Sequence, residues 1–182
     1  MAIRPILRLG HPLLRQIANP VTELATPALR ELVRDLLETM RANDGAGLAA
    51  IQIGVLQRVV VFEVTANPRY PDAGPVPLTV LVNPTIELLG DERDLGWEGC
   101  LSVPGMRGLV PRYRRLRYRG FDEEGRPIDR TVDDFHARVV QHECDHLDGI
   151  LYPQRIEDLT QFGFQEELVA NGVLSPAAAA AD

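Results

Sequence analysis

Apolar residues recur at helical spacing in the first quarter of the chain, and they predict an amphipathic helix from about Thr26 to Arg41. Thr26 has the hydroxyl typical of an N-cap, and Pro27 suits the first helical position because its missing N–H needs no partner there. The run Asn43-Asp44-Gly45 ends the pattern. The predicted apolar stripe consists of Leu29, Leu32, Val33, Leu36, Leu37 and Met40.

Other local patterns predict strands, turns and a short helix. Two β-branched runs, Arg58 to Val64 and Thr79 to Val82, predict buried strands. Between them, Asn67 to Pro77 contains four prolines, which predicts an ordered or semi-rigid loop. Asp122-Glu123-Glu124-Gly125 predicts a hairpin turn between two strands. Pro12 to Ala18 is compatible with a short helix.

The residues around His142 predict a second helix with two apolar faces. At roughly 100° per residue, Phe135 and Val139 lie within about 60° of His142, and another apolar stripe occupies the opposite side. Because such a helix has to be covered on both sides, we expect it to lie between layers at the centre of the molecule. The opposite stripe is Val140, Cys144, Leu147 and Leu151, and the narrow polar strip between the two is Asp134, Arg138, Gln141, Asp145 and Asp148.

Composition narrows the class of protein. The chain has 182 residues, 45% of them apolar and 25% charged, which suits one compact domain. We assign residues 1–174 to a single catalytic domain and expect the low-complexity residues 175–182 to be a disordered tail. A net charge of -7 argues against a general affinity for nucleic acid or anionic membranes.

The cysteines and the apolar stretches point to a reduced, cytoplasmic protein. Cys100 and Cys144 are too few for a disulfide framework. No apolar stretch is as long as a membrane span, and the N-terminus lacks the features of a secretory signal.

The segment Arg112 to Arg119 contains five arginines and allows two interpretations, an RNA-binding surface or a solvated strand face. In a strand, Arg115, Arg117 and Arg119 would share one face, with apolar residues between them on the other. All 19 basic residues of the chain are arginine, so a cluster of them carries little information. The acidic total favours the solvated strand face.

His142-Glu143-Cys144-Asp145-His146 is an HExxH segment. On a helix, His142 and His146 lie about 40° apart, so both imidazoles can reach one metal ion. Glu143 lies about 60° to 100° to the side of them, close enough to hold a water molecule there. A pattern this short also arises by chance, and both histidines would then be ordinary core or surface residues.

A third ligand has to come from outside the two histidines. Cys144 projects about 160° away from them, as expected of a small buried hydrophobe. Zincin-type proteases use a downstream residue, for which Glu157, Glu166 and Glu167 are formally available. Cys100 is the better candidate, because it follows a glycine that permits close approach and a thiolate suits a site with two imidazoles. A lone cysteine is, however, also a common small core residue.

A third segment, Gly45 to Gln52, has two glycines that let a backbone approach a ligand closely, and it ends on an amide donor. Together with Glu98 to Ser102 and Gln141 to Gly149, it resembles the peptide deformylase family. The signature of that family is GxGLAAxQ, then EGCLS, then QHExxHxxG, in this order and at about these separations. The resemblance covers most of the chain, from Leu9 to Tyr152, and three motifs in order are far more specific than one.

The resemblance implies a role for each matching residue. Glu143 would act as general base and then as general acid, and Gln52 with the backbone N–H of Leu101 would stabilise the oxyanion. Glu98 would also orient a ligand histidine. The metal ligands would be Cys100, His142 and His146. The substrate-binding residues would be Gly45, Gly47, Glu98 and Val139.

The resemblance also implies a fold, a cofactor and a partner. The fold would be α+β, with antiparallel strands packed around the central HExxH helix. The cofactor would be one divalent metal ion per chain, with Fe²⁺ favoured and Zn²⁺, Ni²⁺ or Co²⁺ able to substitute. The partners would be N-formylated nascent peptides near the ribosome, from which the enzyme releases formate. The acidic C-terminal segment offers no basic helix for ribosomal RNA, so we expect neither direct nucleic-acid binding nor a membrane partner.

Two other functions are compatible with parts of the pattern. They are a zincin-type endopeptidase and an inactive relative that binds N-termini.

The sequence departs from the family pattern at two places. Ala46 replaces a larger aliphatic residue common between the two glycines, so the peptide-binding wall would be more open. Arg138 and Val139 stand where some bacterial members have apolar or cysteine residues around the methionine pocket.

Overall fold

The computed structural model describes residues 3–65 and 74–175. Most of the predicted loop from Asn67 to Pro77 and the predicted tail beyond Ser175 lie outside these residues.

Two antiparallel sheets form the framework of the molecule. In the larger sheet the strand order is β1-β2-β3-β6-β7, and in the smaller sheet it is β4-β5-β8. The larger sheet contains β1 (Gly47–Ala49), β2 (Val59–Val64), β3 (Val76–Leu88), β6 (Arg115–Phe121) and β7 (Pro127–Asp133). The smaller sheet contains β4 (Arg93–Cys100), β5 (Val103–Tyr113) and β8 (Phe162–Phe164).

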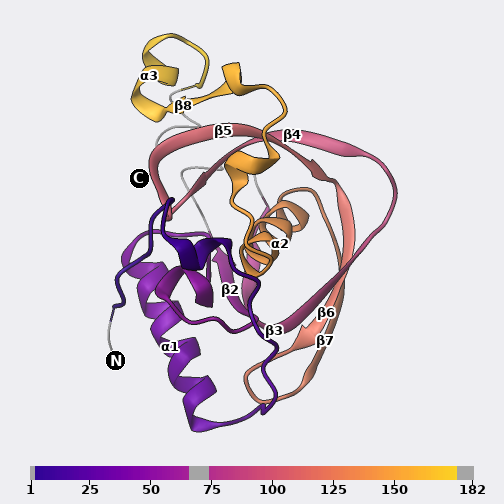
Figure 1. The fold of residues 1–182 in the computed structure, drawn as a ribbon. Helices are drawn as coiled ribbons and strands as arrows, with labels where there is room; N and C mark the ends of the chain where they lie inside the picture. The colour runs from indigo at the N-terminus through magenta and orange to yellow at the C-terminus, as the bar shows by residue number, and fades with distance from the viewer. Residues whose placement is uncertain (1–2, 66–73, 176–182) are drawn as a thin grey trace.

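Helix α2 (Asp134–Leu147) lies in the middle of the molecule, with strands of both sheets around it (Figure 1). Its residues Ala137, Val140 and Leu147 are fully buried in one apolar cluster with Phe62 of β2 and Tyr118 of β6. The predicted α+β fold, with antiparallel strands packed around a central HExxH helix, is therefore confirmed.

Helix α1 (Pro27–Ala42) covers part of the larger sheet and begins where the sequence predicts. The hydroxyl of Thr26 accepts a hydrogen bond from the backbone N–H of Leu29 at 3.2 Å. Its predicted apolar stripe packs against alternate residues of β2 and β3, among them Val61 and Val82. The remaining elements are short: η1 (Pro12–Arg15), η2 (Ala50–Ile53), η3 (Tyr152–Arg155), η4 (Leu159–Gln161) and α3 (Gln165–Ala170).

The end of α2 corrects one detail of the predicted helix. The helix stops at Leu147, and Gly149 follows with a φ of +73°, a left-handed conformation that a glycine adopts without strain. Leu151 therefore leaves the helix and packs beside Tyr152 in a separate apolar cluster. Its assignment to the helical stripe was wrong, because wheel positions do not report where a glycine ends a helix.

The predicted strands are present, but one is longer than predicted. Strand β3 has 13 residues, against the four from Thr79 to Val82. Its residues from Val76 to Val82 pair with β2, and its residues from Val82 to Leu88 pair with β6. The register of the pairing with β6 shifts between Val82 and Thr85. Asn83 and Pro84 at this shift interrupt the apolar pattern, which hides the second half of the strand in the sequence.

Within the arginine-rich segment, Arg115, Arg117 and Arg119 of β6 form a solvated strand face, as predicted, whereas Arg112 lies in β5 and is buried. Arg117 pairs with Asp129 at 2.6 Å and Arg119 with Glu87 at 3.0 Å, while Tyr118 between them is buried. The predicted turn at Asp122 to Gly125 joins β6 to β7. Among the helices of the described residues, none has the length and apolar character needed to cross a membrane.

Candidate active site

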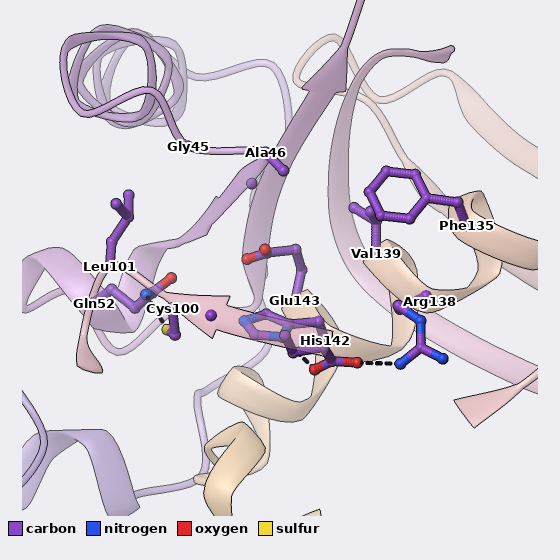
Figure 2. Close-up of a pocket in the computed structure, with 13 residues that line it drawn as sticks. Gly45, Ala46, Gln52, Cys100, Leu101, Phe135, Arg138, Val139, His142 and Glu143 are labelled. Carbon is purple, nitrogen blue, oxygen red and sulfur yellow. Dashed lines mark hydrogen bonds and ion pairs between the residues drawn. The ribbon is translucent and has the colours of Figure 1, made fainter. Parts of the chain in front are cut away.

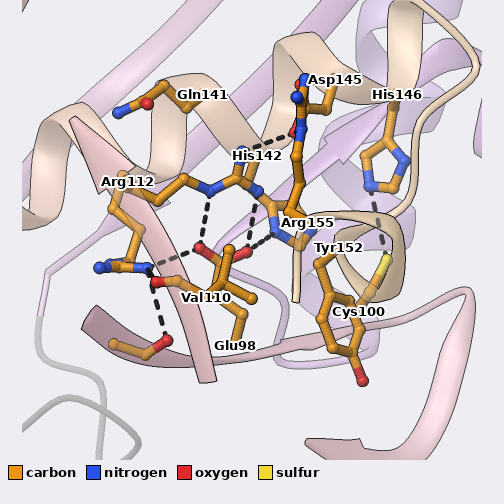
Figure 3. Close-up of polar contacts among 12 residues, drawn as sticks. Glu98, Cys100, Val110, Arg112, Gln141, His142, Asp145, His146, Tyr152 and Arg155 are labelled. Carbon is orange, nitrogen blue, oxygen red and sulfur yellow. Dashed lines mark hydrogen bonds and ion pairs between the residues drawn. The ribbon is translucent and has the colours of Figure 1, made fainter. Parts of the chain in front are cut away.

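Two histidines on one face of α2 and a cysteine from β4 form the centre of the site (Figure 3). His142 and His146 are one helical turn apart, and their ring centroids are separated by 5.0 Å. Cys100 ends β4 and brings its Sγ to 3.4 Å from Nε2 of His146. One possible ligand atom from each residue lies within 4.8 Å of the other two. The fold thus brings together the three residues that the sequence singles out as ligands.

The other candidates for a third ligand lie elsewhere. Cys144 belongs to the apolar cluster between α2 and the larger sheet, where burial raises the pKa of its thiol. Glu157 is exposed and pairs with Arg93 at 3.2 Å. Glu166 and Glu167 are exposed in the first turn of α3.

The chemistry of the cluster fits a divalent transition-metal ion. A thiolate with two imidazoles is a suitable donor set for such ions. Two tetrahedral ligands at about 2.1 and 2.3 Å from one ion would be roughly 3.6 Å apart, close to the 3.4 Å between Cys100 and His146. Within the described part of the chain, the buried side-chain polar atoms without a hydrogen-bond partner are Oε2 of Glu143 and Nδ1 of His146. Both belong to this site.

A buried carboxylate orients one of the histidines. Glu98 is 3% exposed, and its Oε2 lies 2.9 Å from Nδ1 of His142. Burial alone would raise the pKa of Glu98, but the charge of Arg112 and hydrogen bonds from His142 and Arg112 hold that pKa well below its ordinary value. The ionised carboxylate can only accept, so Nδ1 of His142 donates and its Nε2 is left as the candidate ligand atom.

Glu143 borders the same cavity as Cys100 and His142. It is 4% exposed, and this burial raises the pKa of its carboxyl to about 7, opposed by the nearby His142 and supported by Glu98. Gly47 of β1 makes room for it, because a Cβ at that position would collide with the Glu143 carboxyl. A residue with a Cβ at position 47 would therefore force the Glu143 carboxyl to move.

Gln52 and Leu101 lie on the side of the cavity opposite Phe135 and Val139 (Figure 2). The side-chain oxygen of Gln52 accepts a hydrogen bond from the backbone N–H of Ala49 at 2.8 Å. Its Nε2 donates to Oγ of Ser102 at 3.0 Å and lies 3.5 Å from Sγ of Cys100. These contacts hold an amide donor beside the cluster.

The cavity has about 540 Å³ of empty space, part of which is open to solvent. The four residues predicted to bind substrate all line it, namely Gly45, Gly47, Glu98 and Val139. Phe135 and Ala46 add apolar surface at the end where Val139 lies (Figure 2). An apolar side chain could occupy this end while its backbone lies toward the cluster.

The sequence reasoning missed the residues that hold Glu98. Arg112 is 5% exposed and donates to both carboxylate oxygens of Glu98, at 2.9 and 3.0 Å. Arg138 donates to Oε1 of the same carboxylate at 2.8 Å. Arg112 also pairs with Asp145 at 2.6 Å, which in turn binds Arg155 (Figure 3). The only signal in the sequence was Glu98 itself, because a glutamate in a buried motif needs a positively charged partner.

The fold and this cluster define a metallohydrolase of the HExxH type with a cysteine as the third donor. Residues 3–162 match the family described as polypeptide deformylase. The chain is 61% identical over 166 residues to peptide deformylase 2 of Ralstonia nicotianae, covering 91% of this chain and 94% of that protein. It is 59% identical to peptide deformylase 1 of Nitrosomonas europaea, with the same coverage of both chains.

Solved structures agree with the sequence relatives. The class I type b peptide deformylase of Acinetobacter baumannii, bound to Met-Ala-Ser, superposes with a TM-score of 0.82 at 39% identity. The match covers 85% of this chain and 99% of that one. The peptide deformylase of Thermotoga maritima gives a TM-score of 0.76 at 34% identity, covering 87% of this chain and all of the other.

The chain belongs to the polypeptide deformylase family. It is a metal-dependent hydrolase that removes the N-formyl group from nascent polypeptides.

Proposed function

We propose that Cys100, His142 and His146 bind one divalent metal ion, and that Glu143 carries out the proton transfers of formyl hydrolysis. The observation that carries this proposal is the cluster of three donor atoms within 4.8 Å of one another, beside the buried Glu143 carboxylate, whose Oε2 has no hydrogen-bond partner among residues 3–65 and 74–175. A divalent ion in this set would polarise the formyl carbonyl. It would also lower the pKa of a water molecule, so that the water can lose a proton and attack near neutral pH.

Glu143 then performs two steps. It accepts a proton from the attacking water while the oxygen forms a bond to the formyl carbon. It returns the proton to the departing nitrogen as the C–N bond breaks, which leaves formate and a free N-terminal amine. Burial raises the pKa of the Glu143 carboxyl to about 7, which suits both steps because the group can accept and return a proton near neutral pH.

Two donors face the charge that develops on the formyl oxygen. The Nε2 amide of Gln52, held by Ser102 and Ala49, and the backbone N–H of Leu101 are the proposed donors. The polar backbone of Gly45 and Gly47 borders the cavity and supports an extended peptide. Val139 lies at the apolar end, where the methionine side chain of an N-formylmethionyl peptide would bind.

The native metal and the place of action belong to the same proposal. We favour Fe²⁺ because of the likeness to the deformylase family, while the donor set also accepts Zn²⁺, Ni²⁺ or Co²⁺. The proposed substrates are chains emerging from the ribosome in the cytoplasm. A net charge of -7 supports encounter with nascent peptides rather than direct binding to RNA.

The test compares two substrates on protein purified without oxygen, with its metal content measured on the same sample. Formyl-Met-Ala should release formate. Acetyl-Met-Ala should react far more slowly, because its additional methyl group must fit beside the three proposed metal ligands. Cleavage of internal bonds in casein, with no formate from formyl-Met-Ala, would instead identify an endopeptidase. Protein that binds formyl-Met-Ala without turnover, although loaded with metal, would identify an inactive relative.

A further inference from the structure

We propose that Arg138 is a positioning residue of the deformylase site. By holding Glu98 in place, it keeps the ring of His142 oriented toward Cys100 and His146. This inference rests on the proposed role of His142 as a ligand. Arg138 is only 9% exposed and borders the cavity beside Val139 (Figure 2).

Glu98 accepts two hydrogen bonds on each of its oxygens. Oε2 accepts from Nη2 of Arg112 at 3.0 Å and from Nδ1 of His142 at 2.9 Å. Oε1 accepts from Nε of Arg112 at 2.9 Å and from Nη1 of Arg138 at 2.8 Å. Arg112, which also pairs with Asp145 at 2.6 Å, holds both oxygens from strand β5. The fourth bond, from Arg138, adds a charge-assisted contact to Oε1 from helix α2.

Arg138 is itself held by backbone groups of the smaller sheet. Its guanidinium donates to the carbonyl oxygen of Asp94 at 2.7 Å and to that of Gly96 at 3.4 Å, both in β4. It also donates to the carbonyl oxygen of Val110 in β5 at 2.9 Å. One side chain of α2 thus connects the helix to two strands and to Glu98 at once.

The position of Arg138 on the helix links this connection to the ligand. Arg138 precedes His142 by four residues, so the two side chains share one face of α2. A shift or rotation of the helix that moved His142 would also stretch the bonds from Arg138 to β4 and β5. The contacts of Arg138 therefore fix the part of the helix from which His142 projects.

Gly96 gives independent evidence that the approach of Arg138 is built into the fold. Its backbone does not have a positive φ, so the conformation alone does not call for glycine. A Cβ at this position would lie 2.6 Å from Cζ and 2.7 Å from Nη2 of Arg138. The space that the missing side chain leaves in β4 is the space that the guanidinium occupies.

The test uses Co²⁺ as the only metal, because its visible spectrum reports the geometry of its ligands. The measurements are the spectrum, the Co²⁺ affinity in competition with a chelator, and the melting temperature. Arg138→Met should weaken Co²⁺ affinity by about 10- to 100-fold and change the spectrum. Gly96→Ala should act in the same direction, since it displaces the guanidinium but keeps every polar group of the site. Arg138→Lys should be intermediate, because an ammonium can bind Glu98 but cannot also reach all three carbonyl groups.

Arg58→Met is the matched control. Arg58 binds the other end of α2, with Nη1 at 2.7 Å from Asp148 and 3.4 Å from the carbonyl oxygen of Leu147. Its loss should lower the melting temperature and leave the Co²⁺ spectrum and affinity unchanged. If Arg138→Met does not fold, Gly96→Ala and Arg138→Lys decide the question.

Two results would overturn the inference, and they differ in what else they overturn. If the Arg138 and Gly96 variants behave like Arg58→Met, with lower stability but unchanged Co²⁺ binding, Arg138 is a structural residue only and the proposed ligand set stands. If wild-type protein binds no Co²⁺, the ligand set fails and the positioning role fails with it.

Discussion

Glu143 occupies an environment that a folded protein normally avoids. A buried carboxyl usually has partners for both oxygens, because an unsatisfied polar group costs on the order of 1–3 kcal/mol. Glu143 is buried, and its Oε2 has no partner among the described residues. Burial also raises the pKa of its carboxyl to about 7. A buried carboxyl with one unpaired oxygen, beside three candidate metal ligands, is better explained by proton transfer than by stability.

The first prediction follows at this scale. Glu143→Gln keeps the shape of the side chain but removes the group that accepts and returns the proton. We expect the variant to fold and to keep its metal, while kcat for formate release falls by at least ~10²-fold. Metal content and kcat are to be measured on one preparation. Asp148→Asn, an exposed carboxylate just beyond the same helix, serves as control. Full occupancy with wild-type turnover would refute the assigned role.

At the scale of elements, the site depends on how closely α2 approaches its neighbours. The side chain of Gln141 binds both backbone groups of Tyr113 in β5, accepting from N–H at 3.1 Å and donating to the carbonyl oxygen at 2.8 Å. With Arg138 and Arg112, it joins the helix to the β4–β5 hairpin that carries Cys100. Three residues of the polar strip predicted on α2 are therefore internal, and they hold the candidate ligands of the two elements in register; these residues are Arg138, Gln141 and Asp145.

The second prediction concerns the contact of β1 with α2. Gly47→Ala places a methyl group where the Glu143 carboxyl lies. We expect the carboxyl to move and kcat to fall by about 10²-fold, since a displacement near 1 Å can have that effect. Gly163→Ala in β8 is a matched control, because its Cβ would meet Leu168 only at an ordinary 3.6 Å. Equal kcat in both variants would show that the position of Glu143 does not depend on Gly47.

At the scale of the molecule, the site lies where three separate parts of the chain meet. The smaller sheet supplies Cys100, the larger sheet supplies Gly47, and α2 between them supplies both histidines. A metal ion bound to ligands from both β4 and α2 would hold these parts together and would stabilise the folded state over the unfolded one.

The third prediction is a shift of the melting temperature on metal removal. A site held at 100 times its Kd contributes about 2.7 kcal/mol, which corresponds to roughly 5–10 °C for a chain of this size. Thermal scans of apo and Ni²⁺-loaded protein should show this difference. Cys100→Ser should abolish it, whereas Cys144→Ala should keep it and lose only on the order of 1 kcal/mol of packing. The opposite pattern would exchange the assignments of the two cysteines.

The sequence by itself determined those structural features that depend on residues close together in the chain. The start of α1 follows from Thr26 and Pro27, and the alternation around Arg117 predicts its solvated strand face. The two histidines share a face because four residues make about one helical turn. The three motifs in their order indicated the family, and the resemblance to that family predicted the antiparallel arrangement around α2.

Only the tertiary structure decided which distant groups meet. Cys100 and His146 are 46 positions apart, and their 3.4 Å contact depends on how β4 packs against α2. The burial of Arg138 and its bonds to Glu98 follow from the same packing. In the sequence this arginine is one polar position on a helix among several. Local periodicity fixes the direction of a side chain within its own element, but the partner it reaches depends on loops and sheet pairing that no local pattern encodes.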